Sequence, residues 1–394
     1  MTSSTPAPAA VPRAAWRTAV LGGMASYMDA ATIVSTGTAL VLFQPALGLT
    51  PWDIGALSAL LTLGLAIGAL LGGRLGDLLG RRRVFTVDLV VFVVGLALLV
   101  GAVNTPMLYA GVVIAGLAMG ADIPTSLALI AEEAPRGQRG RLVAFSQLLW
   151  VGGIIGAVVF SALFSGLGTL GARLLYAHML VVALVVLVLR RRLVESQEWR
   201  AARAEQPAVE VEGAISGSSL RHLMRGPLLA AVVATGLYYG IGNLAANTFG
   251  QFQTYLFVNV AGTSVTSASL IGLLGFPVGL VGAVVFMRVA DRPSRMRWFA
   301  FGAVLLCGGT AVPLVFGISL TTLIIMALAS GLGGPFAGEA IYKVWSQELF
   351  PTLLRGSAQG ITIAFTRILA AAFAFVTPAI AAANASALIG ICSR

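Results

Sequence analysis

The sequence predicts an all-α integral membrane protein made of two similar helix bundles. Hydrophobic residues make up 58% of the 394 residues and charged residues only 10%, whereas a soluble globular chain carries roughly a quarter charged residues. Apolar stretches follow one another along the chain, and most reach the roughly 20 residues that a bilayer crossing requires. Two charged motifs also occur twice in the same order.

The repeated motifs divide the chain into two halves. The charged segment Gly73–Arg83 returns in weaker form 214 residues later, at Met287–Arg297. The segment Glu132–Gly140 is matched 216 residues later by Glu348–Gly356. Two unrelated motifs that repeat in order at one spacing indicate a duplicated unit. Each half is therefore expected to form one bundle, and the two bundles are expected to be pseudo-symmetric.

Eleven apolar stretches are expected to cross the membrane as helices. They fall at residues 17–43, 53–73, 84–103, 107–131, 141–166, 170–189, 227–258, 266–287, 298–316, 319–343 and 357–383. Duplication predicts six spans in each half, but only Ala385–Arg394 follow the eleventh, so the twelfth is expected to be truncated or missing. The expected parts are a disordered cytoplasmic tail at 1–16, a six-helix bundle at 17–189, a cytoplasmic linker at 190–226 and a C-terminal bundle at 227–394.

Positive charge predicts how the helices are oriented. The turns after the second, fourth, sixth, eighth and tenth spans hold nearly all the loop arginines, and the opposite turns hold only Arg173 and the terminal Arg394. Because Lys and Arg accumulate on the cytoplasmic side, we expect a multi-pass plasma-membrane protein with a cytoplasmic N-terminus. The net charge of +10 is thus explained by topology, and no nucleic-acid partner is expected. The lipid bilayer is the expected surrounding, and the protein is expected to be a monomer.

Few residues suit metal, redox or catalytic chemistry. Cys307 and Cys392 both lie in apolar surroundings, and His178 and His222 are isolated from one another. No disulfide framework, metal site or cofactor is therefore expected. No nucleophile, base and orienting residue share a suitable spacing, so the sequence does not indicate an enzyme.

Several segments together resemble one family. Gly73–Arg83 resembles the signature loop between helices two and three of the major facilitator superfamily. Three motifs resemble those of its sugar porter branch: Glu132-x-x-Pro135-x-x-x-Arg139-Gly140, Glu348-x-x-Pro351-x-x-x-Arg355-Gly356 and Glu195-Ser196-x-x-Trp199. Three further segments resemble bacterial inositol transporters, namely Tyr27–Ala30, Gly120–Pro124 and Tyr342–Pro351. The resemblance implies secondary active transport of an inositol, another polyol or a sugar by alternating access, with proton symport.

Two alternatives stay open at this point. Gly120–Pro124 also resembles a segment of phosphate and organic-anion symporters, and the chain lacks the span-seven Gln-Gln pair of ordinary sugar porters. A proton-coupled anion symporter is therefore the second hypothesis. The missing twelfth helix leaves a third, a truncated remnant or sensor that does not transport.

The repeated loops contain a candidate cytoplasmic gate. Glycines allow the sharp turn, and a helix N-terminus favours a nearby carboxylate. The resemblance implies that Asp77 faces the start of span eleven near Gly356 and Ser357. Arg81 to Arg83 and Arg139 could then pair with Glu132 and Glu133. For Arg82 and Arg83 the preferred alternative is a solvated basic loop that only fixes topology. The candidate gate residues are Gly73, Asp77, Gly80, Arg81, Glu132, Arg139, Asp291, Arg295, Glu348 and Arg355.

Charged residues inside the spans are candidates for proton coupling or substrate binding. At about 1.5 Å per residue, Asp29, Asp122 and Arg367 each lie about 15–18 Å from the cytoplasmic ends of their spans, so they share one depth. Glu339 is a fourth candidate and is spaced i, i+4 from Lys343. Charges at this depth are expensive, roughly 2.5–3.5 kcal/mol each, and mark functional sites. The alternative interpretation is an internal ion pair that only holds helices together.

Uncharged polar residues supply a candidate substrate site. Asn243, Asn247 and Gln251 recur at i, i+4 and i+8 and so line one helix face. With Tyr238 and Tyr342 they could bind the hydroxyl groups and apolar ring of a polyol. Two acids against one base at the shared depth favour a neutral substrate over an anion. Asp88, one turn into the third span, is interpreted as structural.

Overall fold

The structure is a computed structural model that describes residues 11–191, 193–205, 223–255, 276–316 and 320–383. In these ranges the regular secondary structure is helical, and no strand occurs. The helices of the first half are α1 (Arg13–Leu47), α2 (Pro51–Leu79), α3 (Arg81–Val100), α4 (Thr105–Glu132), α5 (Arg139–Phe164), the 3-10 turn η1 (Ser165–Leu167), α6 (Thr169–Arg190) and α7 (Gln197–Ala204). Those of the second half are α10 (Gly226–Tyr255), α12 (Phe276–Val289), α13 (Arg295–Phe316), α14 (Leu320–Ala337), α15 (Glu339–Glu348) and α16 (Thr352–Ala383).

The described helices agree with the predicted all-α membrane class. Seven described stretches are long and apolar enough to cross a membrane, namely α1 to α4, α5 with η1, α6 and Gly226–Leu244 of α10. Pro277–Val289 in α12 is a shorter apolar helix. The truncated twelfth span was predicted at 385–394, which lies outside the described residues. Residues 256–275 also lie outside them; they include the end of the predicted span 227–258 and the beginning of the predicted span 266–287.

Three predicted boundaries differ from the structure. α1 begins at Arg13, so the helix reaches into the segment predicted as a tail. The predicted linker contains α7, which the Ser196 side chain caps by accepting a hydrogen bond from the Trp199 N–H at 3.0 Å. The predicted tenth span is interrupted at Gly338, between α14 and α15, three residues after Pro335. The length of an apolar stretch in the sequence does not reveal such a break in the helix.

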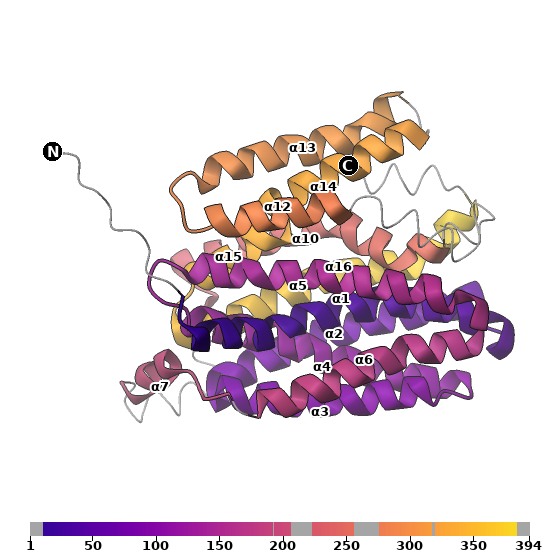
Figure 1. The fold of residues 1–394 in the computed structure, drawn as a ribbon, viewed down its shortest axis with the longest axis horizontal. Coiled ribbons are helices and arrows are strands. Elements are labelled where there is room, and N and C mark those ends of the chain that lie inside the picture. The colour runs from indigo at the N-terminus through magenta and orange to yellow at the C-terminus, as the bar shows by residue number, and fades with distance from the viewer. Residues whose placement is uncertain (1–10, 192, 206–222, 256–275, 317–319, 384–394) are drawn as a thin grey trace.

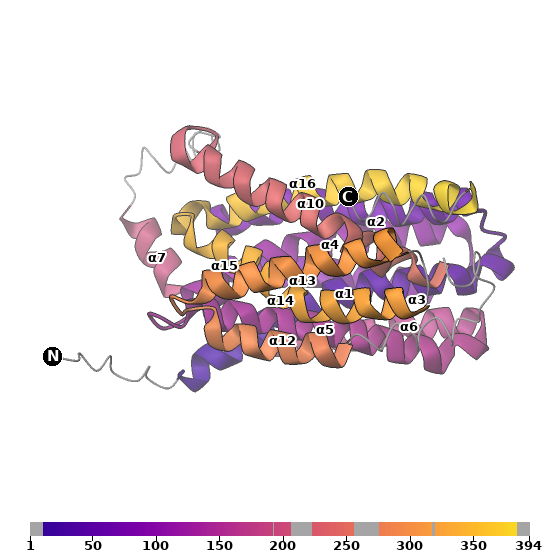
Figure 2. The same ribbon diagram turned by 90° about the horizontal axis from the view of Figure 1, so that it is seen from above.

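The two halves form bundles whose long helices run along a common axis (Figure 1). Turning the molecule shows α10 and α12 to α16 lying over α1 to α6 (Figure 2). The most extensive contact between the halves joins α2 to α16, and α5 with α12, α1 with α10 and α5 with α15 also meet across the seam. The pairs α2–α16 and α5–α12 place the repeated loops of each half beside the other half, as the sequence repeat predicts.

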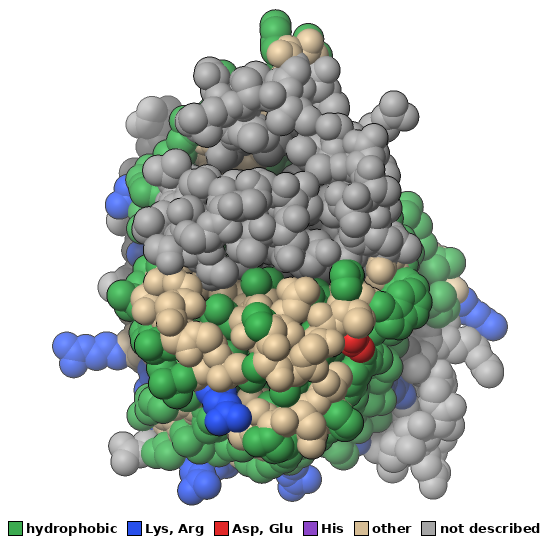
Figure 3. All heavy atoms as spheres, turned by 90° about the vertical axis from the view of Figure 1, so that its right-hand side faces the viewer, with side chains coloured by type: hydrophobic (Ala, Val, Ile, Leu, Met, Phe, Trp, Pro, Cys, Tyr) green, Lys and Arg blue, Asp and Glu red, His purple; other side chains and the backbone are tan. Residues whose placement is uncertain are grey.

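One end of the molecule carries α7 and the charged loops, and we call it the α7 end (Figures 1 and 2). The opposite end is seen face on in Figure 3. Its described surface consists mostly of hydrophobic side chains and of backbone and uncharged polar atoms, with few charged side chains. This difference between the two ends parallels the uneven distribution of arginine that the sequence displays.

Glycines allow the helix backbones to approach closely at two crossings. Between α2 and α4, a Cβ atom added to Gly120 would clash with the carbonyl oxygen of Leu65. Between α2 and α16, a Cβ atom on Gly73 would clash with the carbonyl oxygen of Gly356. Small residues at such crossings are a general device of helix packing in membranes. The seam between the halves is therefore as tight as the packing inside a bundle.

Replacing Gly120 by Ala should destabilise the N-terminal bundle, because the added methyl group has no room beside the α2 backbone. The expected loss is about 1–3 kcal/mol, the usual range for overpacking. It would be read as a lower midpoint of thermal unfolding of the purified protein. Gly242→Ala in α10 is the matched control, since nothing lies within 4 Å of its added Cβ atom; it should hold or raise the midpoint. Equal midpoints for the two variants would contradict this account of the α2–α4 crossing.

Candidate functional site

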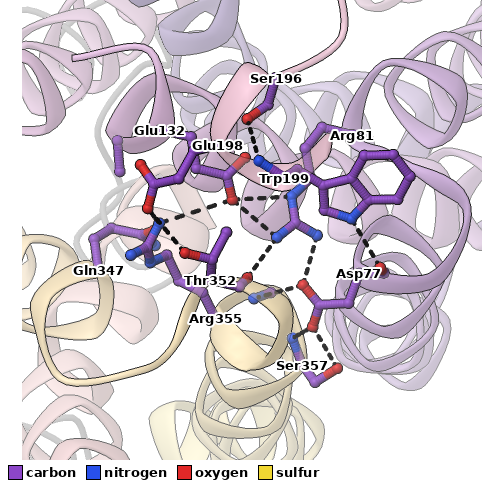
Figure 4. Close-up of polar contacts among 12 residues, drawn as sticks. Asp77, Arg81, Glu132, Ser196, Glu198, Trp199, Gln347, Thr352, Arg355 and Ser357 are labelled. Atoms are coloured by element: carbon purple, nitrogen blue, oxygen red, sulfur yellow. Dashed lines mark hydrogen bonds and ion pairs between the residues drawn. The ribbon is translucent and has the colours of Figure 1, made fainter. Parts of the chain in front are cut away.

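At the α7 end, Asp77 of α2 contacts the beginning of α16 across the seam (Figure 4). Its Oδ2 accepts hydrogen bonds from the Ser357 N–H and hydroxyl, both at 2.6 Å, and its Oδ1 accepts one from the Gly356 N–H at 3.2 Å. Asp77 is only 2% exposed. A buried carboxylate with this many donors is strongly held, because hydrogen bonds to charged groups are stronger than neutral ones. The contact that the resemblance implied is present.

Arg81, the first residue of α3, joins three elements around Asp77. Its Nη1 lies 2.5 Å from Asp77 Oδ1, and its Nη2 lies 2.9 Å from Glu132 Oε1 at the end of α4. Nη2 also donates to the carbonyl oxygen of Thr352 at 2.8 Å. The guanidinium is completely buried, and a buried cation requires such partners. Arg81 therefore ties α2 and α4 of one half to α16 of the other.

The short helix α7 closes this end from outside the bundle. Glu198 accepts from Arg139 of α5 at 2.8 Å and from the Thr352 hydroxyl of α16 at 2.8 Å, and so bridges the halves. Its Oε1 also lies 3.6 Å from Arg355. The Trp199 indole N–H donates to the Asp77 carbonyl oxygen at 2.9 Å. Figure 4 shows these side chains converging on the start of α16.

The expected partners of two arginines need correction. Arg139 pairs with Glu198 and not with Glu132 or Glu133, because α7 lies beside the start of α5. Glu133 instead accepts from the Gln197 backbone N–H at 3.4 Å. Arg82 donates to the Arg191 carbonyl oxygen, so its side chain joins loops of one half. The sequence did not reveal that a helix would form where these charges meet.

Gly80 and Glu195 hold the turn between α2 and α3. Gly80 has φ +101°, in the region that favours glycine, and an added Cβ atom would meet Glu195 Oε2 at 2.5 Å. Glu195 accepts from the N–H groups of Arg81 at 2.9 Å and Arg82 at 3.1 Å. A carboxylate at a helix N-terminus is favourable. Gly80 thus lets Glu195 approach the start of α3.

The second half repeats the same contacts with the partners exchanged. Asp291 accepts from the backbone N–H groups of Gly140 and Arg141 at the start of α5, both at 2.7 Å. Arg295 forms a bidentate pair with Glu348 at 2.8 and 2.9 Å. These residues lie 214 to 216 positions after or before their counterparts in the first half. Each half therefore sends one aspartate to a helix start of the other half.

A second polar cluster lies deeper in the seam and joins α1 to α16. Arg367 Nη2 lies 3.1 and 3.0 Å from the two carboxylate oxygens of Asp29. Asp29 is 1% exposed and Arg367 is 3% exposed. The expectation that Arg367 would reach an acid of the first half is confirmed. The pair links the two bundles by charge-assisted hydrogen bonds between residues 338 positions apart.

Lys343 of α15 forms a second buried ion pair in the seam. Its Nζ lies 3.0 Å from Glu339 one turn earlier, as the i, i+4 spacing predicted. Across the seam, the same ammonium lies 3.1 Å from Gln147 Oε1 of α5 and 3.3 Å from the Ser26 hydroxyl of α1. The sequence did not point to Gln147 or Ser26. Their polar character inside apolar spans is the signal that could have identified them.

Two stacked tyrosines lie beside these charges. The rings of Tyr239 and Tyr342 are 4.0 Å apart and nearly parallel, at 5°. The Tyr342 hydroxyl is 2.6 Å from that of Thr362 in α16. Tyr239 lies close enough to Glu339 and Arg367 for their charges to act on it. Tyr342 thus belongs to the seam cluster, and sequence reasoning missed Tyr239 by choosing its neighbour.

Tyr238 has a different position from the one expected. Its hydroxyl donates to the Ala337 carbonyl oxygen at 2.6 Å, at the interruption between α14 and α15. Its ring packs against Trp345 and Phe299 inside the C-terminal bundle. Adjacent residues of a helix point about 100° apart, so only one of the two tyrosines can face Tyr342. Tyr238 stabilises the broken helix and lies away from the paired charges.

The remaining span-seven candidates lie at the edge of the described structure. Asn243 is a half-buried residue of α10. Asn247 and Gln251 fall within the same helix, but their side chains lie outside the described residues. The predicted amide stripe is therefore untested and stays a prediction.

Asp122, predicted at the same depth as Asp29 and Arg367, pairs with Arg190 and not with Arg367. Its Oδ2 lies 2.8 Å from Arg190 Nη1 at the end of α6, and its Oδ1 accepts from Ser126. Both partners belong to the N-terminal bundle. Counting residues gives the depth of a side chain but not the helix face on which it lies. The sequence also placed Arg190 in a loop, whereas it is completely buried.

Among the described residues, no group of three or more His, Cys, Asp or Glu could hold a metal ion. The deeper ionisable groups of the seam instead form two acid–base pairs, Lys343 with Glu339 and Arg367 with Asp29.

Two apolar helix bundles that meet along a seam of buried ion pairs define a polytopic helical membrane protein. The chain belongs to the Major Facilitator Superfamily, whose family model matches residues 19–375. The minor myo-inositol transporter IolF of Bacillus subtilis (strain 168) is 36% identical over 359 residues, covering 89% of this chain and 80% of the relative. The putative metabolite transport protein YncC of the same strain is 29% identical over 412 residues, with 91% and 83% covered.

A solved structure shares the fold. The proton:xylose symporter XylE of E. coli, bound to 6-bromo-6-deoxy-D-glucose, superposes with a TM-score of 0.74 at 21% identity, covering 95% of this chain and 89% of that one. The resemblance to bacterial inositol transporters that the motifs indicated is confirmed by the identity to IolF. These relatives are transporters, and the chain is accordingly a multi-pass membrane protein and not an enzyme.

Replacing Asp77 by Asn should separate the two halves at the α7 end. The Asn side chain loses the charge that three donors of α16 now share, and each such bond is worth about 1.5–3 kcal/mol. The separated population should rise about tenfold or more. It would be measured by electron-spin distance distributions between labels on Arg83→Cys and Leu349→Cys, both exposed, in a Cys307→Ser, Cys392→Ser background.

The pseudo-symmetric variant Asp291→Asn is the matched control. Asp291 is exposed and receives two backbone hydrogen bonds, whereas Asp77 is buried and also receives a hydroxyl and a guanidinium. Its substitution should lengthen the distances less. A distance distribution that is unchanged in Asp77→Asn would show that this contact does not hold the halves together.

Proposed function

We propose that the protein is a proton-coupled symporter that moves a small neutral polyol of the inositol class across the plasma membrane by alternating access. The observation that carries this proposal is the buried ion pair between Asp29 of α1 and Arg367 of α16. It links the two halves at the place where transporters built from repeats bind substrate and coupling ion.

Charge balance in the seam favours a neutral substrate. Arg367 is paired with Asp29, and Lys343 is paired with Glu339. The four groups sum to zero, so no unpaired cation is left to attract an anion. An anionic substrate would have to compete with carboxylates that are already in place, each charge-assisted contact being stronger than a neutral hydrogen bond. This disfavours the phosphate or organic-anion alternative.

The side chains near these pairs suit a hydroxylated ring. The Tyr239 and Tyr342 rings stack face to face and offer an outer aromatic face, and Gln147, Ser26 and Thr362 are hydrogen-bonding side chains of the same part of the seam. Sugar-like molecules pair an apolar ring face with many hydroxyl groups, so both features are needed together. The relative IolF is named as a myo-inositol transporter, which supports the same substrate class.

Asp29 is the proposed proton acceptor. A proton on Asp29 would remove the charge that holds Arg367 and so release the contact between α1 and α16. The freed guanidinium would keep Glu339 as its nearest acid, since their charges already interact. It could also donate to hydroxyl groups of the substrate. Proton and substrate would then each favour the binding of the other.

The α7 end is proposed to be cytoplasmic, and its charge contacts are proposed to be the gate. Arginine clusters mark the cytoplasmic side of membrane proteins. With Asp77, Arg81 and Glu198 in contact with α16, this side is closed. Opening would break these contacts together, which makes the gate a two-state element.

The substitution Asp29→Asn should abolish uptake driven by a pH gradient while leaving substrate exchange partly intact, because Asn resembles the protonated acid. Uptake of labelled myo-inositol into proteoliposomes with an imposed pH gradient would be compared with counterflow at equal pH. Asp53→Asn is the control, since Asp53 lies at the exposed start of α2, where it caps that helix and accepts from the Tyr109 hydroxyl at 3.3 Å, apart from the seam. Normal uptake by Asp29→Asn at every pH would refute coupling through this residue.

Substrate charge can be tested by competition. Unlabelled inositols in excess should reduce uptake of labelled myo-inositol several-fold, and phosphate or benzoate should have little effect. The reason is that Arg367 is already neutralised by Asp29. Strong competition by a small anion, lost in Arg367→Gln, would reverse the assignment in favour of an anion symporter. Absence of both uptake and counterflow for every solute tested would favour the alternative of a non-transporting protein.

A further inference from the structure

The N-terminal bundle contains a buried charge cluster that takes no part in the seam. It consists of Asp88 of α3, Asp122 of α4 and Arg190 of α6. Their exposed fractions are 5%, 1% and 0%. Because α3, α4 and α6 all belong to the first half, the cluster lies inside one bundle. We call it the α3–α4–α6 cluster.

Arg190 is firmly held in this cluster. Its Nη1 donates to Asp122 Oδ2 at 2.8 Å, and its Nε donates to the Leu21 carbonyl oxygen of α1 at 3.1 Å. The guanidinium carbon lies 3.6 Å from the centre of the Phe85 ring. The other oxygen of Asp122 accepts from the Ser126 hydroxyl at 2.5 Å. Asp122 and Arg190 are thus matched in charge, although the Arg190 Nη2 is buried without a hydrogen-bond partner.

Asp88 is the unmatched member. Neither of its carboxylate oxygens has a hydrogen-bond partner, although both are buried. The charged groups that act on it are Asp122 of α4 and Arg190 of α6. With both acids ionised the cluster would carry a net charge of −1, since Arg190 supplies the single positive charge. An unpaired charge in such a place is unfavourable by several kcal/mol or more.

We propose that Asp88 and Asp122 together bind one proton, held on the Asp88 side while Asp122 keeps its ion pair with Arg190. Two carboxylates that interact in a low-dielectric site titrate as a pair. The bound proton brings the cluster to zero net charge. It also turns one Asp88 oxygen into a hydroxyl donor. The site is therefore a proton-binding dyad in the N-terminal bundle.

This proton is distinct from the one proposed to drive transport. Asp29 contacts Arg367 of the second half, so its environment changes when the halves separate. Among the described residues, the hydrogen-bond and ring contacts of the α3–α4–α6 cluster all lie in α1, α3, α4 or α6. A rigid-body movement of the halves leaves such a cluster intact. The dyad proton therefore stays bound through the transport cycle.

The dyad stabilises the part of the bundle from which α7 emerges. Arg190 is the last residue of α6, and Leu193 just beyond it packs with Leu21, Phe85 and Leu129. Loss of the proton would place a net negative charge beside this packing. The bound proton thus keeps the end of α6 in position.

Infrared difference spectroscopy of the full-length protein in lipid vesicles tests the dyad directly. At neutral pH, the wild type should display a carboxylic-acid carbonyl band that Asp88→Asn removes. Asp122→Asn should remove the same band, because Asp88 would then ionise to pair with Arg190. Asp53→Asn, at an exposed helix cap, should leave it unchanged. A band that persists in Asp88→Asn, or its absence from the wild type, would overturn the proposal.

Stability against pH gives a second readout. A folded state that holds one proton more than the unfolded chain loses stability as pH rises above the unfolded carboxyl pKa of about 4. Asp88→Asn should therefore flatten the fall of the unfolding midpoint that the wild type undergoes as pH rises above about 4. The double variant Asp88→Asn, Asp122→Asn should unfold at a much lower temperature, since Arg190 then has no acid. An equal pH slope in the wild type and Asp88→Asn would also overturn the proposal.

Transport separates this proposal from the proposed function. Asp88→Asn should keep pH-driven uptake of labelled myo-inositol, whereas Asp29→Asn should lose it. Loss of the driven component in Asp88→Asn, with counterflow preserved, would contradict the statement that the dyad proton stays bound. If neither the wild type nor any variant takes up myo-inositol, the proposed function is contradicted. The infrared test then still decides whether the dyad binds a proton.

Discussion

Charge neutrality in the low-dielectric interior is the constraint on which the arrangement of the helices depends. A buried ion that loses its partner is destabilising by about 3–5 kcal/mol. Arg81, Arg190, Lys343 and Arg367 are all nearly or completely buried, and each has an acid within 3.0 Å. These pairs specify which helices lie side by side more narrowly than apolar packing does, because lipid and helix interiors are equally apolar.

The pairs fall into two groups that have different consequences for movement. Asp122 and Arg190 lie within one bundle, so their contact stabilises the bundle in every state. Asp29 and Arg367 join the two bundles, as does Asp77 with the start of α16. Contacts of the second kind must break when the halves separate. Different buried charges thus have different effects. Those within one bundle stabilise that bundle, and those between the bundles stabilise the arrangement in which the two halves are in contact.

The sequence predicted the repeated contacts well and the central charges only in part. The spacing of 214 to 216 residues identified Asp77 with Asp291 and Arg81 with Arg295, because a duplicated fold places duplicated motifs equivalently. Residue counting gave the depth of Asp122 but could not give its direction around the α4 axis. α7 was missed because its polar residues follow a charged turn and carry no membrane signal. The direction of Asp122 and the formation of α7 both depend on packing between segments that are distant in the sequence.

The structure also changes how proton uptake at Asp29 has to be understood. An isolated buried acid would become neutral on protonation, and its burial between the two halves would then be less unfavourable. Asp29 is already neutralised by Arg367, so a proton leaves the seam with one excess positive charge. That charge is stabilised only if new acceptors approach Arg367, and substrate hydroxyl groups can serve in that role. Linkage then requires that substrate raise the affinity for the proton by the same factor as the proton raises that for substrate. In the proposed function, coupling would therefore follow from the ion pair itself.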